Sequence, residues 1–525
     1  MTMAQTRAAT AGAGGWTDDV FTNPVIAGLH PDPSVCRVGD EYYLACSSFE
    51  YYPAVPVFRS RDLVHWEQIG NVLDRPGQLD LPSTTPPSGG VYAPTLRHHD
   101  GRFWLIVTNV VAGGGTLICT ATDPAGPWSD PVRVPGLAGI DPDLAWDEEG
   151  VCWCTYAGIE QVRIDPRTGR TLGRPRRLWS GAPGAQAPEA PHLYRVGGYW
   201  YLLIAEGGTE RGHAVSVARA TAPDGPYEPC PANPILTHRG TNRPIQNTGH
   251  GDLIEAADGS WWMVLLGVRP GGGTPGWHVL GRETFLTPVT WIDGWPVVGA
   301  VAPAMTAPPW TAHPVPAPPP RDDFDEDRLH PRWVSVRSRP AGSWSLTERP
   351  GWLTLHARGA SLDDRDVVFV GRRQQHLSCR VRTMVDPAAG RGGLAVRLDE
   401  RHHYEIEAGD GEVRVVARIG SVRSTVATRP VPAGPVRLRV EVLAAPPGDW
   451  HPGQEPDLLQ FGIEQADAPF TVLAALDGRY LSTEVAGGFT GRVIGMYAAA
   501  GSVRFDWFDY EPREPENGRT LIEVD

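Results

Sequence analysis

Gly28-Leu-His-Pro-Asp-Pro-Ser-Val35 is the stretch that decides the fold prediction, because it opens a pattern that the chain repeats. Asp32 lies between two prolines, and proline fixes its own φ and restricts the residue before it. Residues 35–46 then follow as a strand, a Gly-Asp turn and a second strand. Asp32 is therefore held on a stiff segment at the beginning of a β-hairpin.

Four later stretches follow the same plan of a polar or proline-containing start, a short apolar strand, a tight turn and an aromatic-rich strand. With Asp32, the five starts stand at 32, 94, 141, 189 and 250, about 47 to 62 residues apart. No helical period competes with this repeat. The sequence predicts an all-β protein that begins with a five-bladed β-propeller, in which the first strand of each blade lines the axis. The repeat brings Asp32, Asp141 and Glu189 together around that axis.

Composition excludes several classes of function. The net charge of -14 argues against nucleic-acid and anionic-membrane partners. All 47 basic residues are arginine, which excludes a Schiff-base lysine and a Walker loop. The seven cysteines include no CxxC pair, so no zinc site is predicted. Residues 1–15 lack the apolar core of a signal peptide, and no apolar run reaches 18 residues, so we expect a cytoplasmic location.

Turn and proline content divides the chain into four parts. Residues 1–20 are expected to be a disordered leader, and 21–303 are expected to form the propeller as the catalytic domain. A Pro/Ala-rich stretch, 304–321, is typical of an extended linker. Residues 322–525 alternate short apolar strands with Gly/Pro/Asp turns, which predicts a β-sandwich of jelly-roll-like type as an accessory domain.

Three carboxyl groups at blade starts point to hydrolysis of a glycosidic bond. One carboxylic acid protonates the leaving oxygen, and one carboxylate activates water or attacks the sugar. A third acid nearby raises the pKa of the proton donor by repulsion between like charges. A carboxylate trio alone is a weak signal, because acids at a propeller axis also bind cations.

Specific motifs carry a resemblance to a known family. They are Asn23-Pro-Val-Ile-Ala-Gly-Leu-His-Pro-Asp-Pro-Ser, Ser47-Ser-Phe-Glu-Tyr-Tyr-Pro, Ser60-Arg-Asp-Leu-Val-His-Trp, Gly89-Gly-Val-Tyr-Ala-Pro-Thr, Gly139-Ile-Asp-Pro-Asp-Leu, Glu189-Ala-Pro-His-Leu-Tyr, Ala205-Glu-Gly-Gly-Thr, Gly249-His-Gly, Leu280-Gly-Arg-Glu-Thr, Val370-Gly-Arg-Arg-Gln-Gln-His and Gly488-Phe-Thr-Gly. With them the sequence resembles glycoside hydrolase family 43, on the β-xylosidase and α-L-arabinofuranosidase branch that carries a C-terminal β-sandwich. The resemblance covers nearly the whole chain beyond residue 20.

The resemblance implies an inverting exo-glycosidase that releases terminal β-D-xylosyl or α-L-arabinofuranosyl residues from xylo- and arabino-oligosaccharides. It implies that Asp32 is the general base, Glu189 the general acid and Asp141 the pKa modulator. No cofactor is required by this chemistry, although some members hold a hydrated calcium ion at the axis. The partner implied is a small oligosaccharide, and a homo-oligomer is compatible with it.

The resemblance also implies a set of substrate-binding residues. Phe49 and Tyr92 would line the donor subsite, Arg282 would contact sugar hydroxyls, and His250 would lie at the axis near the calcium position. Phe489, on a sandwich loop, would close the far side of the pocket.

Simpler explanations stay open for several residues. Asp32 and Asp141 also suit turns, Arg282 a structural ion pair, and His250 a buried core position. Phe49, Tyr92 and Phe489 also suit packing. Asp143 stands two positions after Asp141, so the choice of Asp141 depends on its Ile-Asp-Pro context, and Ala190 replaces the glycine usual after the acid.

Two other functions are alternatives to the inverting pentosidase. A retaining fructan-cleaving enzyme shares the fold, but its Trp-Asn-Asp-Pro type of motif is replaced here by His30-Pro-Asp-Pro. A non-catalytic carbohydrate-binding protein would need aromatic residues but not three acids. The sequence does not choose between xyloside and arabinofuranoside.

Overall fold

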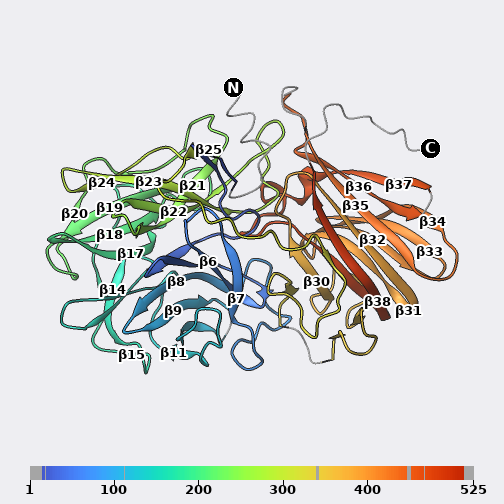
Figure 1. The fold of residues 1–525 in the computed structure, drawn as a ribbon, viewed down its shortest axis with the longest axis horizontal. Helices are drawn as coiled ribbons and strands as arrows, with labels where there is room; N and C mark the ends of the chain where they lie inside the picture. Colours follow the sequence, from blue (N-terminus) through green and yellow to red (C-terminus); the bar gives the residue numbers. More distant parts are fainter. Residues whose placement is uncertain are drawn as a thin grey trace. The chain divides into compact units, whose positions relative to one another are not determined.

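The computed structural model describes residues 15–17, 19–111, 113–338, 342–445, 451–465 and 468–513. Most of the predicted leader, residues 1–14 and 18, lies outside the described residues. The chain divides into two compact units (Figure 1). Unit 1 comprises residues 1–80, 89–269 and 282–315, and unit 2 comprises 81–88, 270–281 and 316–525. In the described part, no helix is long and apolar enough to cross a membrane.

Five antiparallel sheets form most of the described part of unit 1 (Figure 1). Their strands are β3 (Ser34–Val38), β4 (Glu41–Ala45), β6 (Ala54–Ser60) and β7 (Glu67–Leu73); β8 (Val91–His99), β9 (Arg102–Asn109), β10 (Gly115–Ala121) and β11 (Val132–Val134); β12 (Asp143–Trp146), β13 (Cys152–Tyr156), β14 (Glu160–Asp165), β15 (Arg170–Thr171) and β16 (Arg176–Arg177); β17 (Glu189–Val196), β18 (Tyr199–Glu206), β19 (Ala214–Ala220) and β20 (Glu228–Pro229); and β21 (Gln246–Glu255), β22 (Trp261–Val268), β23 (Glu283–Ile292) and β24 (Trp295–Val298). A short β5 (Tyr51–Tyr52) lies between β4 and β6.

The first strands of the five sheets, β3, β8, β12, β17 and β21, are the innermost ones. Neighbouring first strands contact one another from β3 through β8 and β12 to β17, and β21 contacts β3. Each predicted repeat start lies within or just before one of them. The prediction of an all-β chain with a five-bladed propeller followed by a β-sandwich is confirmed.

The core of unit 1 lies between neighbouring blades. Ile106 of the second blade packs with Cys154 of the third, and Leu203 of the fourth with Leu265 of the fifth. All four side chains are fully buried. Burying a large apolar side chain contributes about 1.5–3 kcal/mol, so these interfaces hold the blades in place.

The two ends of the propeller sequence close the ring. Strand β2 (Val20–Thr22) pairs with β1 (Trp16–Thr17) on one side and with β25 (Ala304–Thr306) on the other. The side-chain amide of Asn23 donates to the carbonyl of Leu286 at 2.9 Å, and its oxygen accepts from the Leu286 N–H at 2.9 Å. The His30 N–H donates to the Arg282 carbonyl at 3.1 Å. Ring closure therefore places the loop that carries Asp32 beside Arg282.

The first half of the stretch predicted as a linker is anchored within unit 1. Its residues 304–306 form β25, and the Trp310 ring lies 5.6 Å from that of Trp262. The Trp310 indole N–H donates to the carbonyl of Asp62, and the His313 N–H donates to the Asp62 carboxylate. These residues extend the first and fifth blades rather than spanning open solvent.

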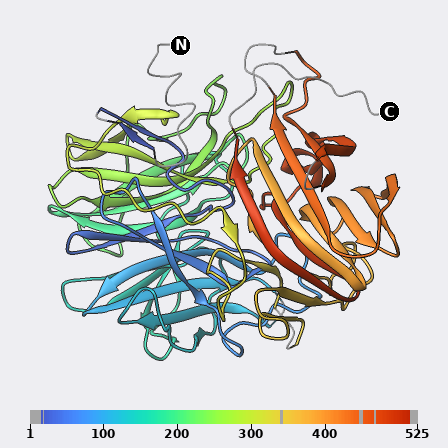
Figure 2. The same cartoon turned by 45° about the vertical axis from the view of Figure 1, so that its right-hand side comes forward.

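Unit 2 is a sandwich built on long antiparallel strands, of which β31 and β38 pair along much of their length (Figure 2). Its elements are β26 (Arg321–Asp322), β27 (Ser335–Val336), β28 (Trp344–Ser345), β29 (Leu353–His356), β30 (Val368–Arg373), β31 (Cys379–Asp399), β32 (His402–Gly409), β33 (Glu412–Ile419), β34 (Val422–Pro430), β35 (Val436–Ala444), β36 (Asp457–Gln465), β37 (Ala468–Asp477), η1 (Gly478–Leu481), α2 (Thr483–Ala486) and β38 (Val493–Pro512). Leu394, Tyr404, Phe461 and Phe505 lie in its apolar core.

Candidate active site

The candidate active site lies where the five innermost strands begin. Asp141 precedes β12, Glu189 opens β17, Tyr92 is the second residue of β8, and His250 lies within β21. Asp32 precedes β3 by two residues.

Several residues of the site adopt the left-handed backbone region that favours glycine. The φ angles are 56° for Asp32, 51° for Phe49, 52° for Asp141, 49° for Ala190 and 47° for His250. Such conformations cost about 1–3 kcal/mol each and persist at functional sites because the surroundings fix them. The left-handed Ala190 explains why a glycine suits the position after Glu189.

Irregular strand pairing changes the direction in which side chains near the site point. The register shifts between Val91 and Pro94, between Glu189 and His192, and between Gln246 and Asp252. A β-bulge bends its strand and redirects a side chain. The innermost strands of the second, fourth and fifth blades are thus irregular near the site.

Asp32 is the most extensively bonded of the three predicted acids. Its Oδ2 accepts from Ser47 Oγ at 2.5 Å, and its Oδ1 accepts from Arg282 Nη1 at 2.9 Å. His250 Nδ1 lies 3.4 Å from the same Oδ1. Arg282 Nη1 also donates to Thr209 Oγ1 at 3.0 Å. The Asp32 carboxylate is therefore fixed in one orientation.

Aromatic side chains line the same site. The Arg282 guanidinium lies over the Phe49 ring, 5.4 Å from its centroid. The Phe49 and Tyr92 rings meet edge to face, with centroids 5.4 Å apart. Phe49 is buried and Tyr92 is partly exposed, so Tyr92 presents the accessible aromatic surface.

Asp32 and Glu189 have pKa shifts in opposite directions. Burial by itself would raise the pKa of Asp32, but attraction to Arg282 and the Ser47 hydrogen bond outweigh it and lower that pKa. Burial, followed by repulsion from Asp32, raises the pKa of Glu189 to about 7. Near neutral pH the site therefore offers one carboxylate and one carboxylic acid.

Asp141 shares the electrostatic environment of these two acids. Burial, then repulsion from Glu189 and Asp32, raises its pKa, while Arg282 and a hydrogen bond from the Ala190 N–H oppose the shift. Two neighbouring buried carboxyls cannot easily ionise together. Asp141 and Glu189 thus retain a proton between them to higher pH than either would alone.

His250 and a second histidine are neutral at the site. Burial lowers the pKa of His250 to about 3 and that of His213 to about 4. His213 Nδ1 lies 3.0 Å from the Asn247 carbonyl oxygen. A Cβ on Gly249 would lie only 2.4 Å from the His213 ring, so this position needs glycine for close approach.

The hydrated calcium ion expected near His250 stays a prediction, and the side chains at the axis do not suit direct coordination of calcium. Calcium takes six to eight oxygen ligands, whereas His192, His213 and His250 present imidazoles. In the part of the chain with described coordinates, no group of three or more His, Cys, Asp or Glu residues is arranged to hold a metal.

A second buried network joins all five blades next to this site. Arg97 of β8 donates to Asp143 of β12 at 2.8 Å and to Asp252 of β21 at 3.0 Å. Tyr194 of β17 donates to Asp252 at 2.5 Å, and Ser34 of β3 donates to it at 2.9 Å. Asp143, the acid that competed with Asp141 in the sequence, is therefore bound to an arginine.

The structure brings seven of the eight predicted site residues into one cluster: Asp32, Phe49, Tyr92, Asp141, Glu189, His250 and Arg282. Phe489 lies in unit 2, where its N–H donates to Ser88 Oγ at 2.8 Å; its predicted place at the pocket stays a prediction. Sequence reasoning assigned no role to Ser47, Thr209 or His213. Ser47 and Thr209 lie in motifs that carried the resemblance, whereas His213 gave no signal.

Comparison with known proteins identifies related sequences over both units. The family model "Glycosyl hydrolases family 43" matches residues 21–296, and "Beta xylosidase C-terminal Concanavalin A-like domain" matches 321–511. The predicted boundaries at 303 and 322 stay predictions.

Individual relatives match along nearly their whole length. A non-reducing end α-L-arabinofuranosidase of Bacteroides ovatus is 39% identical, covering 93% of this chain and 94% of the relative. A xylosidase/arabinosidase of Butyrivibrio fibrisolvens is 35% identical, covering 94% and 98%. The solved structure described as Bacteroides ovatus xyloglucan PUL GH43B superposes with a TM-score of 0.87 at 38% identity, covering 94% of this chain and 100% of that one.

Proposed function

Because the chain belongs to glycosyl hydrolase family 43, we propose that it is an inverting exo-glycosidase that releases terminal β-D-xylosyl or α-L-arabinofuranosyl residues from short oligosaccharides. The observation that carries the proposal is the pair of opposite pKa shifts on Asp32 and Glu189 in one buried cluster. Both terminal sugars are proposed because one relative is named an arabinofuranosidase and another a xylosidase/arabinosidase.

In the proposed reaction Glu189 is the general acid and Asp32 the general base. Glu189 gives its proton to the glycosidic oxygen as the bond from that oxygen to the anomeric carbon breaks. Asp32 takes a proton from a water molecule whose oxygen attacks the same carbon from the opposite face. The products are the free sugar with inverted configuration and the shortened alcohol, and a proton must move from Asp32 back to Glu189 through solvent.

Arg282 has two roles in this proposal. Its bond to Asp32 keeps the base ionised, and its guanidinium would contact hydroxyl groups of the terminal sugar. Tyr92 and Phe49 supply the apolar wall against which the sugar ring packs. Asp141, which accepts from the Ala190 N–H beside Glu189, positions the acid and modulates its pKa.

The deciding experiment measures stereochemistry together with sugar preference. Relative kcat/KM values are measured on aryl β-D-xyloside, α-L-arabinofuranoside and α-L-arabinopyranoside, and proton NMR records the first anomer released from the best substrate. An inverting enzyme releases α-xylose from a β-xyloside. Initial release of the retained anomer would instead favour the fructan-type double displacement, and binding without turnover on any pentoside would favour a non-catalytic role.

A further inference from the structure

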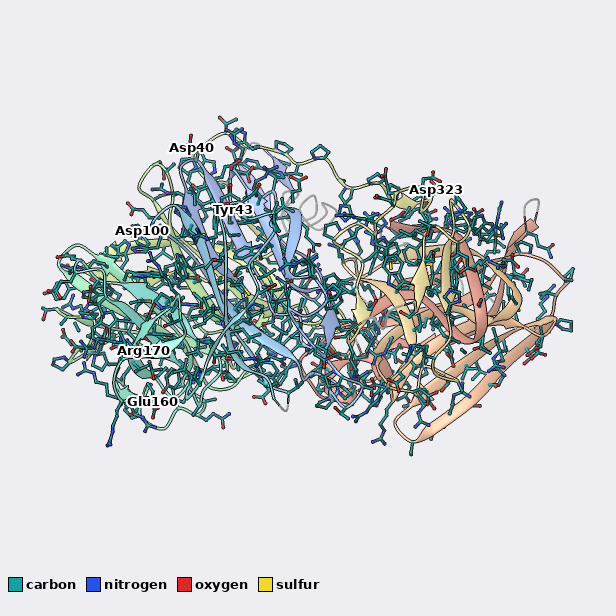
Figure 3. The ribbon with its side chains drawn as sticks, turned by 90° about the horizontal axis from the view of Figure 1, so that it is seen from below. Asp40, Tyr43, Asp100, Glu160, Arg170 and Asp323 are labelled. Carbon is teal, nitrogen blue, oxygen red and sulfur yellow. The ribbon has the colours of Figure 1, made fainter. Side chains whose placement is uncertain are left out.

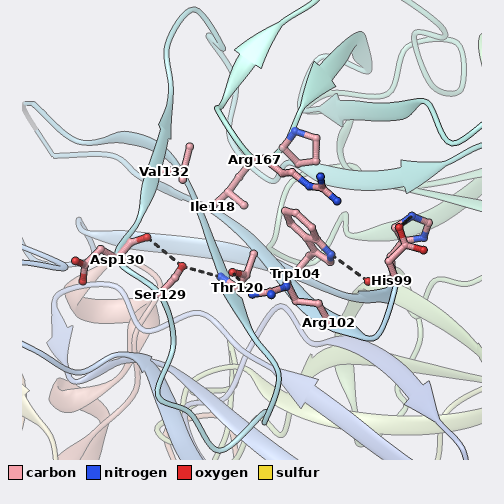
Figure 4. Close-up of a pocket in the computed structure, with 11 residues that line it drawn as sticks. His99, Arg102, Trp104, Ile118, Thr120, Ser129, Asp130, Val132 and Arg167 are labelled. Atoms are coloured by element: carbon pink, nitrogen blue, oxygen red, sulfur yellow. Dashed lines mark hydrogen bonds and ion pairs between the residues drawn. The ribbon is translucent and has the colours of Figure 1, made fainter.

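A second cavity of about 350 Å³ lies in unit 1 between the second and third blades (Figure 4). Its lining comes from the β8–β9 turn, from β9, from β10 and the segment after it, and from the β14–β15 turn. Tyr92 and His99 lie near opposite ends of β8, seven residues apart, which corresponds to roughly 23 Å of extended strand. The cavity is therefore separate from the candidate active site.

One wall of this cavity is apolar. Trp104, Ile118 and Val132 line it, and Trp104 and Ile118 are buried in the packing between the second and third blades. Trp104 is held in place because its indole N–H donates to the His99 carbonyl at 3.3 Å. The apolar wall is therefore rigid.

Polar groups of both signs also line the cavity. Figure 4 draws the Trp104 indole between the side chains of Arg167 and Arg102. The Arg102 and Arg167 side chains are both exposed, and Arg102 donates to Thr120 Oγ1 at 3.4 Å. These two guanidinium groups keep donors available for a ligand.

Two carboxylates also line the cavity. Asp100, which lies at the periphery in Figure 3, faces His99 Nε2 at 3.5 Å. Asp130 is paired with Arg75 at 2.7 Å and also lines the cavity. The cavity therefore offers a ligand donors on Arg102 and Arg167 and acceptors on Asp100 and Asp130.

We infer that this cavity is a second sugar-binding site that takes a neutral pentose or pentose disaccharide. A sugar ring has an apolar face and a hydroxyl edge, which match the apolar lining and the donors and acceptors around it. The volume is near the lower end of small-ligand sites, about 300–1,000 Å³, which suits one or two sugar units. The choice of a pentose depends on the proposed function, whereas the match to a neutral polyol does not.

The test is calorimetric titration of xylobiose into the full-length Glu189→Gln protein, compared with the same protein carrying Arg102→Ala and Arg167→Ala. Two binding events per chain are expected in the first protein. The added substitutions should weaken the second event at least 10-fold and leave the first unchanged. Glu189→Gln with Arg163→Ala is the matched control, since Arg163 is an exposed arginine of β14 that does not line the cavity.

Hydrogen exchange measured by mass spectrometry locates each of the two binding events on the chain. Saturating xylobiose should slow amide exchange in residues 97–104 and 163–169, and the two arginine substitutions should abolish that protection. Protection confined to the segments around residues 32 and 189 would overturn the inference, and so would binding of inorganic phosphate without xylobiose. Wild-type hydrolysis of aryl pentosides tests the proposed function separately, because Arg102→Ala and Arg167→Ala should leave it unchanged.

Discussion

At the scale of single residues, two carboxyl groups with the same chemistry are driven to opposite protonation states by their neighbours. Asp32 accepts hydrogen bonds from Ser47 and Arg282, which favour its charged form. Glu189 is partly buried and faces the charge of Asp32, and both effects favour its neutral form. This separation of pKa values assigns a base and an acid near neutral pH.

Glu189→Gln is expected to lower kcat on xylobiose by about 10²–10⁴-fold, the usual contribution of a general acid. On an aryl xyloside with a strongly acidic leaving group, such as 2,4-dinitrophenol, the loss should be below about 10-fold, because that phenolate leaves without protonation. The measurement is kcat for both substrates on both proteins. Equal losses on the two substrates would mean that Glu189 does not protonate the leaving group.

The pH dependence of kcat/KM follows from the lowered pKa of Asp32 and the raised pKa of Glu189. Activity requires ionised Asp32 and protonated Glu189, so it should be level on the acidic side of neutrality and fall about tenfold per pH unit above about pH 7. Asp141→Asn removes a carboxylate next to Glu189 and should move this alkaline limb to lower pH. An unchanged alkaline limb in Asp141→Asn would contradict the modulator role.

The raised pKa of Glu189 also affects the stability of the folded protein. Since the pKa of Glu189 is raised in the folded state, its favourable contribution is present at acidic pH and is lost as pH rises through about 7. Glu189→Gln should therefore be more stable than the wild type at pH 8, and the difference should vanish near pH 4. Thermal unfolding midpoints at the two pH values measure the effect.

Ser47→Ala tests the hydrogen bond that sequence reasoning missed. Because the Ser47 hydrogen bond helps to lower the pKa of Asp32, loss of this donor should raise that pKa and shift the acidic limb of kcat/KM to higher pH. Ser48→Ala is the control, because the neighbouring Ser48 hydroxyl accepts from the Val55 N–H instead. If both variants keep the wild-type acidic limb, Ser47 does not set the protonation of Asp32.

At the scale of elements, the innermost strands are fastened to one another by a buried ionic network. Arg97 contacts carboxylates of two other blades, and attraction to Arg97 overcomes burial to lower the pKa of Asp252 to about 2. His192, which belongs to the network through Asp143, has its ring 6.5 Å from that of His250. The network therefore couples the packing of the blades to the position of the catalytic cluster.

Arg97→Met should destabilise the protein by about 3–5 kcal/mol, because it leaves two buried carboxylates without their cation. Arg163→Met, an exposed substitution on β14, should change stability by less than about 0.5 kcal/mol. Urea unfolding of the two variants gives the comparison. A loss below 1 kcal/mol for Arg97→Met would show that the carboxylates find other partners.

At the scale of the whole molecule, the division into units does not follow the order of the sequence. Residues 81–88 and 270–281 come from the propeller sequence but belong to unit 2. In that unit Ser338 Oγ accepts from the Leu81 N–H at 2.8 Å, and His278 Nδ1 lies 2.6 Å from Glu484. The Gly273 N–H donates to the Gln454 carbonyl at 2.7 Å.

A fragment of residues 15–315 should therefore be less stable than the full chain, although it contains all five blades. The two segments would lose the partners that satisfy their backbone groups and bury their side chains. Thermal unfolding and solubility of the fragment and the full chain measure this loss. A soluble fragment with an unchanged midpoint would mean that the segments are stable without unit 2.

The sequence by itself determined the repeat, the fold class and the three acids. Strand periodicity, turn residues and the prolines around Asp32 act locally, so they can be read without coordinates. Only the tertiary structure decided which groups meet Asp32: Arg282 and His250 reach it because the ring closes between the first and fifth blades. It also bound Asp143 to Arg97 and so removed the competitor of Asp141. These pairings span tens to hundreds of residues, and the physical reason that they escape a local pattern is that electrostatic partners are set by distance in space.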